Sequence, residues 1–133
     1  MRTTNLAGFT LDAEFENLTN LSAIAFTGTG NNVANVLTGG GASDTLWGLA
    51  GDDSLSGGLG NDVLIGGGGR DTLTGGGGAD VFRYTALGDL GATSTTTDTL
   101  RDFLHSQFDV IDLSAIDANS LVAGDQAFSF IGT

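Results

Sequence analysis

Acidic residues recur at a fixed interval through the middle of the chain. Aspartate occupies every ninth position in a row whose first member is asparagine: Asn35, Asp44, Asp53, Asp62, Asp71 and Asp80. Carboxylate oxygens are the ligands that hard divalent cations prefer, and paired carboxylates can also carry acid–base catalysis. The chain has no cysteine, and its single histidine, His105, lies outside this row, so a zinc site is not expected.

Two other residue types keep the same interval as the aspartates. A large apolar residue follows each position of the row by two residues: Leu37, Leu46, Leu55, Leu64, Leu73 and Phe82. A glycine precedes each position by five residues: Gly30, Gly39, Gly48, Gly57, Gly66 and Gly75. Complete units run over 57–65, 66–74 and 75–83, whereas two earlier units carry Ala42 in the fourth position and Leu49 in the second. Three registers held together in this way indicate a structural repeat.

The period constrains the elements that position these residues. Nine residues are too few for a helix–turn–helix but suit a three-residue strand and a six-residue turn, in which glycines allow positive φ angles and let carbonyl groups converge. Two units complete one 18-residue coil, and coils stack at the strand spacing of about 4.8 Å. The sequence therefore predicts an all-β fold, a parallel β-roll (β-solenoid) of stacked 18-residue coils with irregular N- and C-terminal β caps.

The predicted coils have a thin core, because each strand points one large apolar side chain inward. One ladder contains Leu37, Leu55 and Leu73, and the facing ladder contains Leu46, Leu64 and Phe82. Stacking also places the turns of Asp44, Asp62 and Asp80 along one edge. The turns of Asn35, Asp53 and Asp71 follow the other edge. Carboxylates one coil apart repel each other unless a cation lies between them.

Calcium suits this arrangement better than other metals. Ca²⁺ takes six to eight oxygen ligands in tolerant geometry, whereas Mg²⁺ gives up its water reluctantly and prefers an octahedron. We expect several bound Ca²⁺ ions, about three to five. The alternative is a glycine-rich solenoid without metal, in which the aspartates cap the turns.

The charge balance favours cations over other partners. Acidic residues number 16 against four basic ones, all arginine, and the net charge is −12. No nucleic acid or anionic membrane surface is expected as a partner, because neutralising phosphates requires Lys and Arg. No apolar run of about 18 residues is present, so membrane insertion is not expected either.

Residues 30–83 resemble the RTX, or hemolysin-type, calcium-binding repeats. Residues 84–133 resemble the C-terminal segment that follows such repeats in serralysin-type metalloproteases, through the stretches 98–103, 109–114 and 128–132. In the RTX family each ion lies between two turns one coil apart. The earlier turn supplies the carbonyls of its second and fourth positions, the later turn those of its first and third, and each adds its aspartate.

The resemblance implies three calcium sites in this chain. The first would use Gly40, Ala42 and Asp44 with Gly57, Leu59 and Asp62. The next on the same edge would use Gly58, Gly60 and Asp62 with Gly75, Gly77 and Asp80. The site on the opposite edge would use Leu49, Gly51 and Asp53 with Gly66, Gly68 and Asp71. A side chain at Leu49 is expected to strain its turn.

The ends of the acidic row are less regular. Asn35 replaces the aspartate and Val33 replaces a glycine in the first turn, which we expect to be a cation-free cap held by local bonds of the asparagine. A further site beyond Asp71 would need a ligand from the C-terminal segment, with Asp89, Asp98 and Asp109 as candidates.

The chain divides into three parts that we expect to pack as one module of a larger protein. These are an N-terminal capping coil (1–29), the β-roll (30–83) and a truncated, serralysin-like C-terminal segment (84–133). An outward apolar stripe of Trp47, Val63 and Ile65 is predicted to be covered by the C-terminal segment or a neighbouring domain. The alternative is a tolerated surface tryptophan.

The functional hypothesis follows from the resemblance. It implies a calcium-binding module of a bacterial protein secreted by a type I system, which folds on extracellular Ca²⁺ and assists export of an attached enzyme or effector. Catalysis by this segment is not expected, because neither His-Glu-x-x-His nor Gly-x-Ser-x-Gly is present. The alternative function is binding of a carbohydrate such as alginate, or of another surface, as an accessory module of a secreted polysaccharide-modifying enzyme.

Overall fold

The computed structural model describes residues 8–91 and 95–117; the stretch 128–132, which carries part of the resemblance, lies outside them. The strands are β1 (Gly8–Thr10), β2 (Asn17–Thr19), β3 (Thr27–Thr29), β4 (Val36–Gly40), β5 (Thr45–Ala50), β6 (Ser54–Leu59), β7 (Val63–Gly68), β8 (Thr72–Gly77), β9 (Val81–Arg83), β10 (Thr99–Leu100) and β11 (Val110–Asp112). The helices are the 3-10 turns η1 (Leu87–Leu90) and η2 (His105–Gln107) and the single-turn α1 (Ser114–Asp117). The described part of the chain is therefore nearly all β.

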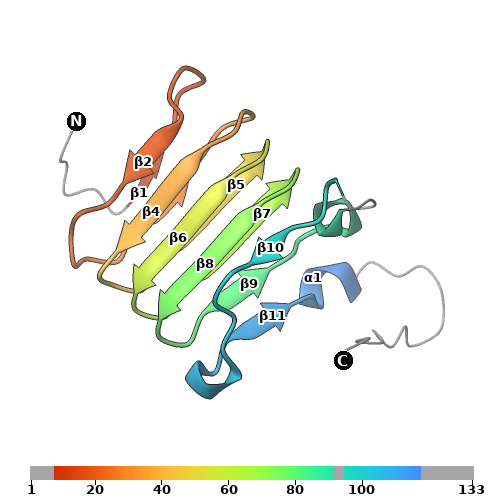
Figure 1. The fold of residues 1–133 in the computed structure, drawn as a ribbon. Helices are drawn as coiled ribbons and strands as arrows, with labels where there is room; N and C mark the ends of the chain where they lie inside the picture. The colour runs from red at the N-terminus through yellow and green to blue at the C-terminus, as the bar shows by residue number, and fades with distance from the viewer. Residues whose placement is uncertain (1–7, 92–94, 118–133) are drawn as a thin grey trace.

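The strands wind into a flattened spiral. One sheet has the order β1-β3-β5-β7-β9-β11 and the other the order β10-β8-β6-β4-β2, so consecutive strands of the repeats lie in opposite sheets. The pairings in both sheets are parallel. In Figure 1 the strands follow one another along the roll from the red N-terminal end to the blue C-terminal end. The predicted parallel β-roll is confirmed.

The register of the sheets reproduces the period of the sequence. In one sheet Leu37 pairs with Leu55 and Leu55 with Leu73, and in the other Leu46 pairs with Leu64 and Leu64 with Phe82. All six side chains have no exposed surface. Both predicted ladders are thus confirmed, because residues that occupy the same place in successive coils meet across the strand spacing.

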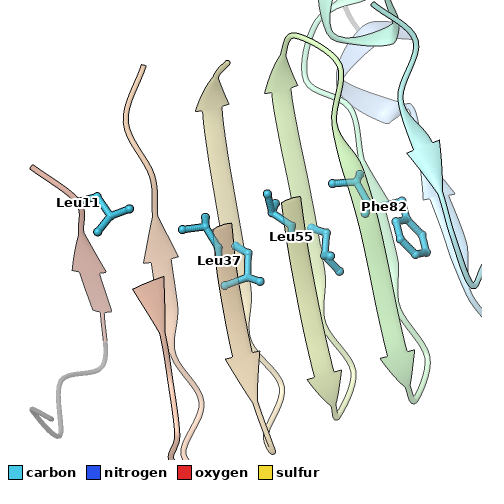
Figure 2. Packing of buried hydrophobic residues seen from close by; sticks show 7 residues of the cluster. Leu11, Leu37, Leu55 and Phe82 are labelled. Atoms are coloured by element: carbon cyan, nitrogen blue, oxygen red, sulfur yellow. The ribbon is translucent and has the colours of Figure 1, made fainter. Parts of the chain in front are cut away.

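The core is the narrow space between these ladders. Figure 2 shows its side chains following one another along the roll, from Leu11 at one end to Phe82 at the other. Leu18 and Leu100 extend it and are partly buried. Burying one such side chain contributes roughly 1.5–3 kcal/mol, so one residue per strand stabilises the fold only modestly. The turns must contribute the rest.

The strands extend further into the turns than predicted. The four from β5 to β8 have six residues each instead of three. They are longer because the ladder continues through the glycines, with Gly58 opposite Gly76 and Leu59 opposite Gly77. The backbone of each turn is therefore held in register with the turn one coil away.

The two ends of the roll are built differently. At the N-terminal end, β1 and β2 pair with β3 and β4 and continue both sheets. At the C-terminal end, Thr99 pairs with Thr72 and Val110 with Val81, so the last coil uses 27 to 29 residues instead of 18. The additional residues form η1, η2 and the loops beside them.

The outward apolar stripe of Trp47, Val63 and Ile65, on the sheet that contains β5 and β7, is covered in part. The helix η1 lies against β7, and Ile65 is only 2% exposed. Val63 and Trp47 are half-buried. At the same register position of the next strands, Arg83 pairs with Asp112 at 2.8 Å. Among the described residues there is no helix with the length and apolar character needed to cross a membrane.

Candidate metal centres in the turns

The aspartates of the repeat link each coil to the one before it. Along one edge, the Oδ1 atom of Asp62 accepts the backbone N–H of Asp44 at 2.7 Å, and Asp80 does the same for Asp62 at 2.9 Å. On the other edge, the N–H of Asp53 donates to Asp71 at 2.8 Å. Each carboxylate thus reaches back one full coil. Three consecutive coils are joined by this contact on the edge of Asp44, Asp62 and Asp80.

The second oxygen of each carboxylate is buried and has no hydrogen-bond partner among the described residues. These are the Oδ2 atoms of Asp44, Asp53, Asp62, Asp71, Asp80 and Asp98. Buried polar atoms nearly always have a partner, and leaving one unsatisfied costs about 1–3 kcal/mol, more for a charged group. A row of six such oxygens indicates that a positive species belongs beside them.

The electrostatic environment leads to the same requirement. Burial, together with the nearby charges of Asp71 and Asp52, raises the pKa of Asp53 to about 7, although a backbone hydrogen bond from Asn35 lowers it. Burial likewise raises the pKa of Asp62 to about 6, with added repulsion from Asp80 and Asp44. The pKa values of Asp44, Asp71 and Asp80 are raised by burial as well. Without a cation, these carboxylates are destabilised as anions.

Backbone carbonyl groups converge between the same turns. A Cβ atom placed on Gly57 would lie 2.6 Å from the carbonyl oxygen of Gly75 and against the Asp62 carboxylate. One placed on Gly60 would lie 2.6 Å from the carbonyl oxygen of Ala42. The second-position carbonyls behave alike: those of Gly40, Leu49 and Gly58 lie against the Cα atoms of Gly58, Gly67 and Gly76. Glycine is needed here because a side chain would fill the space that the carbonyls share.

The predicted ligands are therefore brought together, though not all are equally free. The fourth-position carbonyls of Gly51 and Gly60 lie against Gly69 and Gly78, and the first-position carbonyl of Gly66 lies against Gly48. The third-position carbonyls of Gly68 and Gly77 each accept an N–H from the preceding coil, at 2.9 and 2.8 Å. A carbonyl has two lone pairs, so this bond leaves one for a ligand. Leu59, also in the third position, pairs opposite Gly77 with its side chain 67% exposed.

Leu49 adopts the conformation that the repeat assigns to glycine. Its φ is +85°, whereas the glycines in the same position of other turns, such as Gly58 and Gly67, have φ angles of +109° and +97°. A left-handed conformation costs a residue with a side chain roughly 1–2 kcal/mol. The side chain is 42% exposed, so burial offsets little of this strain.

The turn of Asn35 is closed by amide groups. The Oδ1 atom of Asn35 accepts the N–H of Asn31 at 2.7 Å, and its Nδ2 donates to the Oδ1 of Asn31 at 3.1 Å. The Nδ2 of Asn31 in turn donates to the carbonyls of Asp12 and Phe15, both at 2.8 Å. The asparagine thus bonds locally, as predicted, and amide hydrogens occupy the oxygens of this turn.

The three C-terminal candidates differ sharply in their contacts. Asp98 accepts the N–H of Asp71 at 2.8 Å through Oδ1, and its Oδ2 is buried without a close partner. Burial raises the pKa of Asp98 to about 6, although a hydrogen bond from the Tyr84 hydroxyl to its side chain lowers it. Asp109 has both oxygens occupied, by the N–H of Asp80 at 3.0 Å and that of Leu104 at 2.7 Å. Asp89 accepts local bonds from residues 85 and 86 through Oδ2. Among these three, Asp98 alone continues the pattern of the repeat.

A second link between turns was not predicted from the sequence. The residue before three of the aspartates accepts an N–H from the coil that follows. Ser43 accepts from Asn61 at 3.0 Å, Asn61 from Ala79 at 2.9 Å, and Asp52 from Arg70 at 3.0 Å. The signal available in the sequence was the polar character of these positions, at nine-residue spacing.

The donor set fits calcium. Among residues 8–91 and 95–117, no three acidic or histidine side chains gather closely enough to hold a metal alone. The predicted sites do not require such a group, since each combines two carboxylates with four backbone carbonyls. Oxygen donors in this number are typical of Ca²⁺, and the buried Oδ2 atoms lie where the turns bring carbonyls together.

Comparison with known proteins places this fold among described families. A family model described as Peptidase M10 serralysin C terminal matches residues 18–133. Among solved structures, the chain is similar to the AlgE6R3 subunit of the mannuronan C5-epimerase from Azotobacter vinelandii, with 34% sequence identity and a TM-score of 0.47. That match covers 86% of this chain and 60% of the other, so the chain spans less than two thirds of that relative. A search of curated proteins found no match.

Proposed function

This chain belongs to the peptidase M10 serralysin C-terminal family and is a non-catalytic repeat module of the RTX type. We propose that the module binds calcium between its turns and folds when calcium is supplied. The observation that carries the proposal is the row of buried, unpartnered Oδ2 atoms. A bound Ca²⁺ ion supplies positive charge and oxygen coordination at that row. It offsets the burial and the repulsion that together raise the pKa of Asp62 and Asp53.

Three sites have the complete set of predicted donors. Two lie on the edge of Asp44, Asp62 and Asp80, and these two share the carboxylate of Asp62. The third lies on the other edge, between the turns of Asp53 and Asp71. The protein's own residues orient the ligands, since each Oδ1 is fixed by a backbone N–H and the free Oδ2 is left for the ion.

A fourth site is proposed between Asp71 and Asp98. Both carboxylates have a buried Oδ2 without a partner, and the N–H of Asp71 fixes Asp98 as it would the aspartate of a further repeat. The charge of Asp89 lies close enough to raise the pKa of both carboxylates, so a cation at this position would meet three negative groups.

The biological role follows from coupled binding and folding. A chain with net charge −12 and one apolar side chain per strand is expected to remain unfolded where calcium is scarce, as inside a bacterial cell. It would pass through an export channel in that state and fold outside, where calcium is abundant. We propose that the module serves an attached enzyme or effector of the same secreted protein in this way.

The direct test is a calcium titration of the metal-free chain followed by far-ultraviolet circular dichroism. We expect the β signal to appear cooperatively with Ca²⁺, to reverse with EGTA, and to require far more Mg²⁺. Equilibrium dialysis in parallel should find three or four ions bound per chain, about the number of sites described. A full β signal in the presence of EGTA would refute the proposal.

A second candidate function is favoured by the outer face of the sheet that contains β6 and β8. Outward side chains there are the hydroxyl residues Ser54, Ser56, Thr72 and Thr74, which are exposed or half-buried. Hydroxyl groups in regular rows can bond to sugar hydroxyls or to another ordered surface. Isothermal calorimetry of the calcium-loaded chain with alginate oligomers distinguishes the two functions, because a module that only folds on calcium would release no heat.

A further inference from the structure

Asp102 holds the last repeat turn from outside. Its Oδ1 accepts the N–H of Gly75 at 2.8 Å, and its Oδ2 accepts the N–H of Gly76 at 2.7 Å. Asp102 follows β10, which pairs with β8 at Thr99–Thr72 and Leu100–Leu73, so its backbone stands at the place where the next coil would begin its turn. The side chain thus provides acceptors to a turn that no further repeat follows.

This contact, together with the pairing of Gly76 with Gly58 across the strands, sets the direction in which the Gly75 carbonyl points. No peptide bond in the described residues is cis, and in a trans peptide the C=O of one residue and the N–H of the next point in opposite directions. Fixing the Gly76 N–H toward Asp102 therefore turns the Gly75 carbonyl toward the preceding coil. There it lies close to Gly57 and the Asp62 carboxylate, where the second site of that edge is predicted.

Asp102 is itself held in place by its neighbours. The adjacent Phe103 packs on Phe82, the last residue of its ladder, with ring centroids 6.1 Å apart. Further along the same loop, Asp109 bonds to the N–H groups of Asp80 and Leu104 and so closes the loop on itself. These contacts fix the loop 102–109 without an unpartnered carboxylate oxygen at Asp109.

We infer that Asp102 is a positioning residue for calcium: it aims the Gly75 carbonyl into the site formed with Asp62 and Asp80, without itself binding the ion. The inference rests on the proposed function. It assigns to Asp102 a role that belongs to one edge of the roll. The site between Asp53 and Asp71 on the other edge should not depend on it.

The test compares Asp102→Asn and Asp102→Ala with the wild-type chain and with Glu14→Gln. The control removes one negative charge from an exposed side chain of the N-terminal coil. ¹⁵N-labelled protein is titrated with CaCl₂, and the amide signals of Asp80 and Asp71 report the two edges separately. Hydrogen exchange of the Gly75 and Gly76 amides reports the contact itself.

In Asp102→Ala we expect about tenfold weaker calcium binding at the Asp80 edge, about tenfold faster exchange at Gly75 and Gly76, and wild-type binding at the Asp71 edge. Asp102→Asn retains one acceptor and should lie between alanine and wild type. Equal weakening at both edges, or failure to fold at saturating calcium, would assign Asp102 to general stability and overturn the inference. Wild-type affinity at the Asp80 edge in both variants would also overturn it. If the wild-type chain bound no calcium, the proposed function would fall first.

Discussion

The turns in the middle of the roll and the turns at its ends use the same polar residues in opposite ways. In the middle, one oxygen of each aspartate accepts a backbone N–H, and the other oxygen is buried and has no partner in the described structure. At the ends, Asn35 and Asp109 have both side-chain polar atoms engaged by amides or carbonyls. We therefore expect the middle turns to depend on a cation, and the turns closed by Asn35 and Asp109 not to.

This difference shows how a β-solenoid can be conditional on an ion and still be closed at both ends. The end turns stabilise the exposed edges of the sheets with ordinary hydrogen bonds. We expect the middle turns, with raised pKa values at Asp53 and Asp62, to resist folding until their charge is neutralised. Substitutions that give a middle turn the bonding of an end turn, or the reverse, should have the largest effects on calcium binding and stability.

The strongest expected effect is that of Asp62→Asn. Asp62 is shared by both predicted sites on its edge, whereas Asp53 serves one, because the Asn35 turn is closed by amides. Removing one partner of a buried charged group costs about 3–5 kcal/mol, and here two ions lose a ligand. Equilibrium dialysis should show two calcium ions fewer in Asp62→Asn and one fewer in Asp53→Asn. Equal losses would contradict the shared carboxylate.

Acidification should replace calcium in part. A carboxyl group whose pKa is higher in the folded chain than in the unfolded chain binds its proton more tightly when folded. Protonation therefore stabilises the calcium-free roll at low pH, and this stabilisation is lost as the pH rises through about 6 for Asp62 and about 7 for Asp53.

Circular dichroism without calcium should accordingly show more β structure near pH 5 than near pH 8. The gain in β signal on adding calcium should be smaller at pH 5 than at pH 7, because protons already neutralise part of the same carboxylates in the folded chain. Identical titrations at the two pH values would show that the middle carboxylates are not the groups that calcium neutralises.

Asn35→Asp converts an end turn into one of the middle type. The variant loses the Nδ2 donor to Asn31 and places a second carboxylate beside Asp53, whose Oδ1 accepts the N–H of residue 35. We expect a loss of about 1–3 kcal/mol in the free energy of unfolding of the calcium-loaded chain, measured with urea. Asn32→Asp, on an exposed neighbour, is the matched control and should change little.

The smallest effect on stability is expected at Leu49, which lies in one of the middle turns. Leu49→Gly relieves a left-handed side-chain conformation and should stabilise the calcium-loaded chain by about 1 kcal/mol, after the entropy cost of glycine is subtracted. Leu59→Gly is the control, because Leu59 is exposed and has no positive φ, so glycine should destabilise there. If both changes destabilised the protein, the strain at Leu49 would not be significant.

The middle of the roll could be predicted from the sequence because its structure repeats. One period fixed the sheets, the ladders of Leu55 and Leu64, and the stacking of Asp44 on Asp62, since every coil applies the same local rule. The longer strands were missed because glycine in a turn gives no sign that it also pairs with the next coil.

The ends could not be predicted in the same way. Asp98 and Asp109 stand 27 and 29 residues after the aspartates that they contact, because η1, η2 and their loops interrupt the period. Nothing in the adjacent residues indicates that Asp98 keeps a free oxygen and Asp109 does not. Asp102 was not singled out as a site residue at all, since its partners, the amides of Gly75 and Gly76, are defined by tertiary pairing alone.

The backward reach of the aspartates gives the roll a preferred direction of growth. The N–H of Asp44 finds its acceptor on Asp62, in the coil that follows it in sequence, and the N–H of Asp62 finds its own on Asp80. A coil that folds onto the N-terminal side of an ordered roll finds carboxylate acceptors that are already in place. A coil that folds onto the C-terminal side must first order its own carboxylate. We therefore expect this contact to favour nucleation at the C-terminal coil, followed by winding toward the N-terminus.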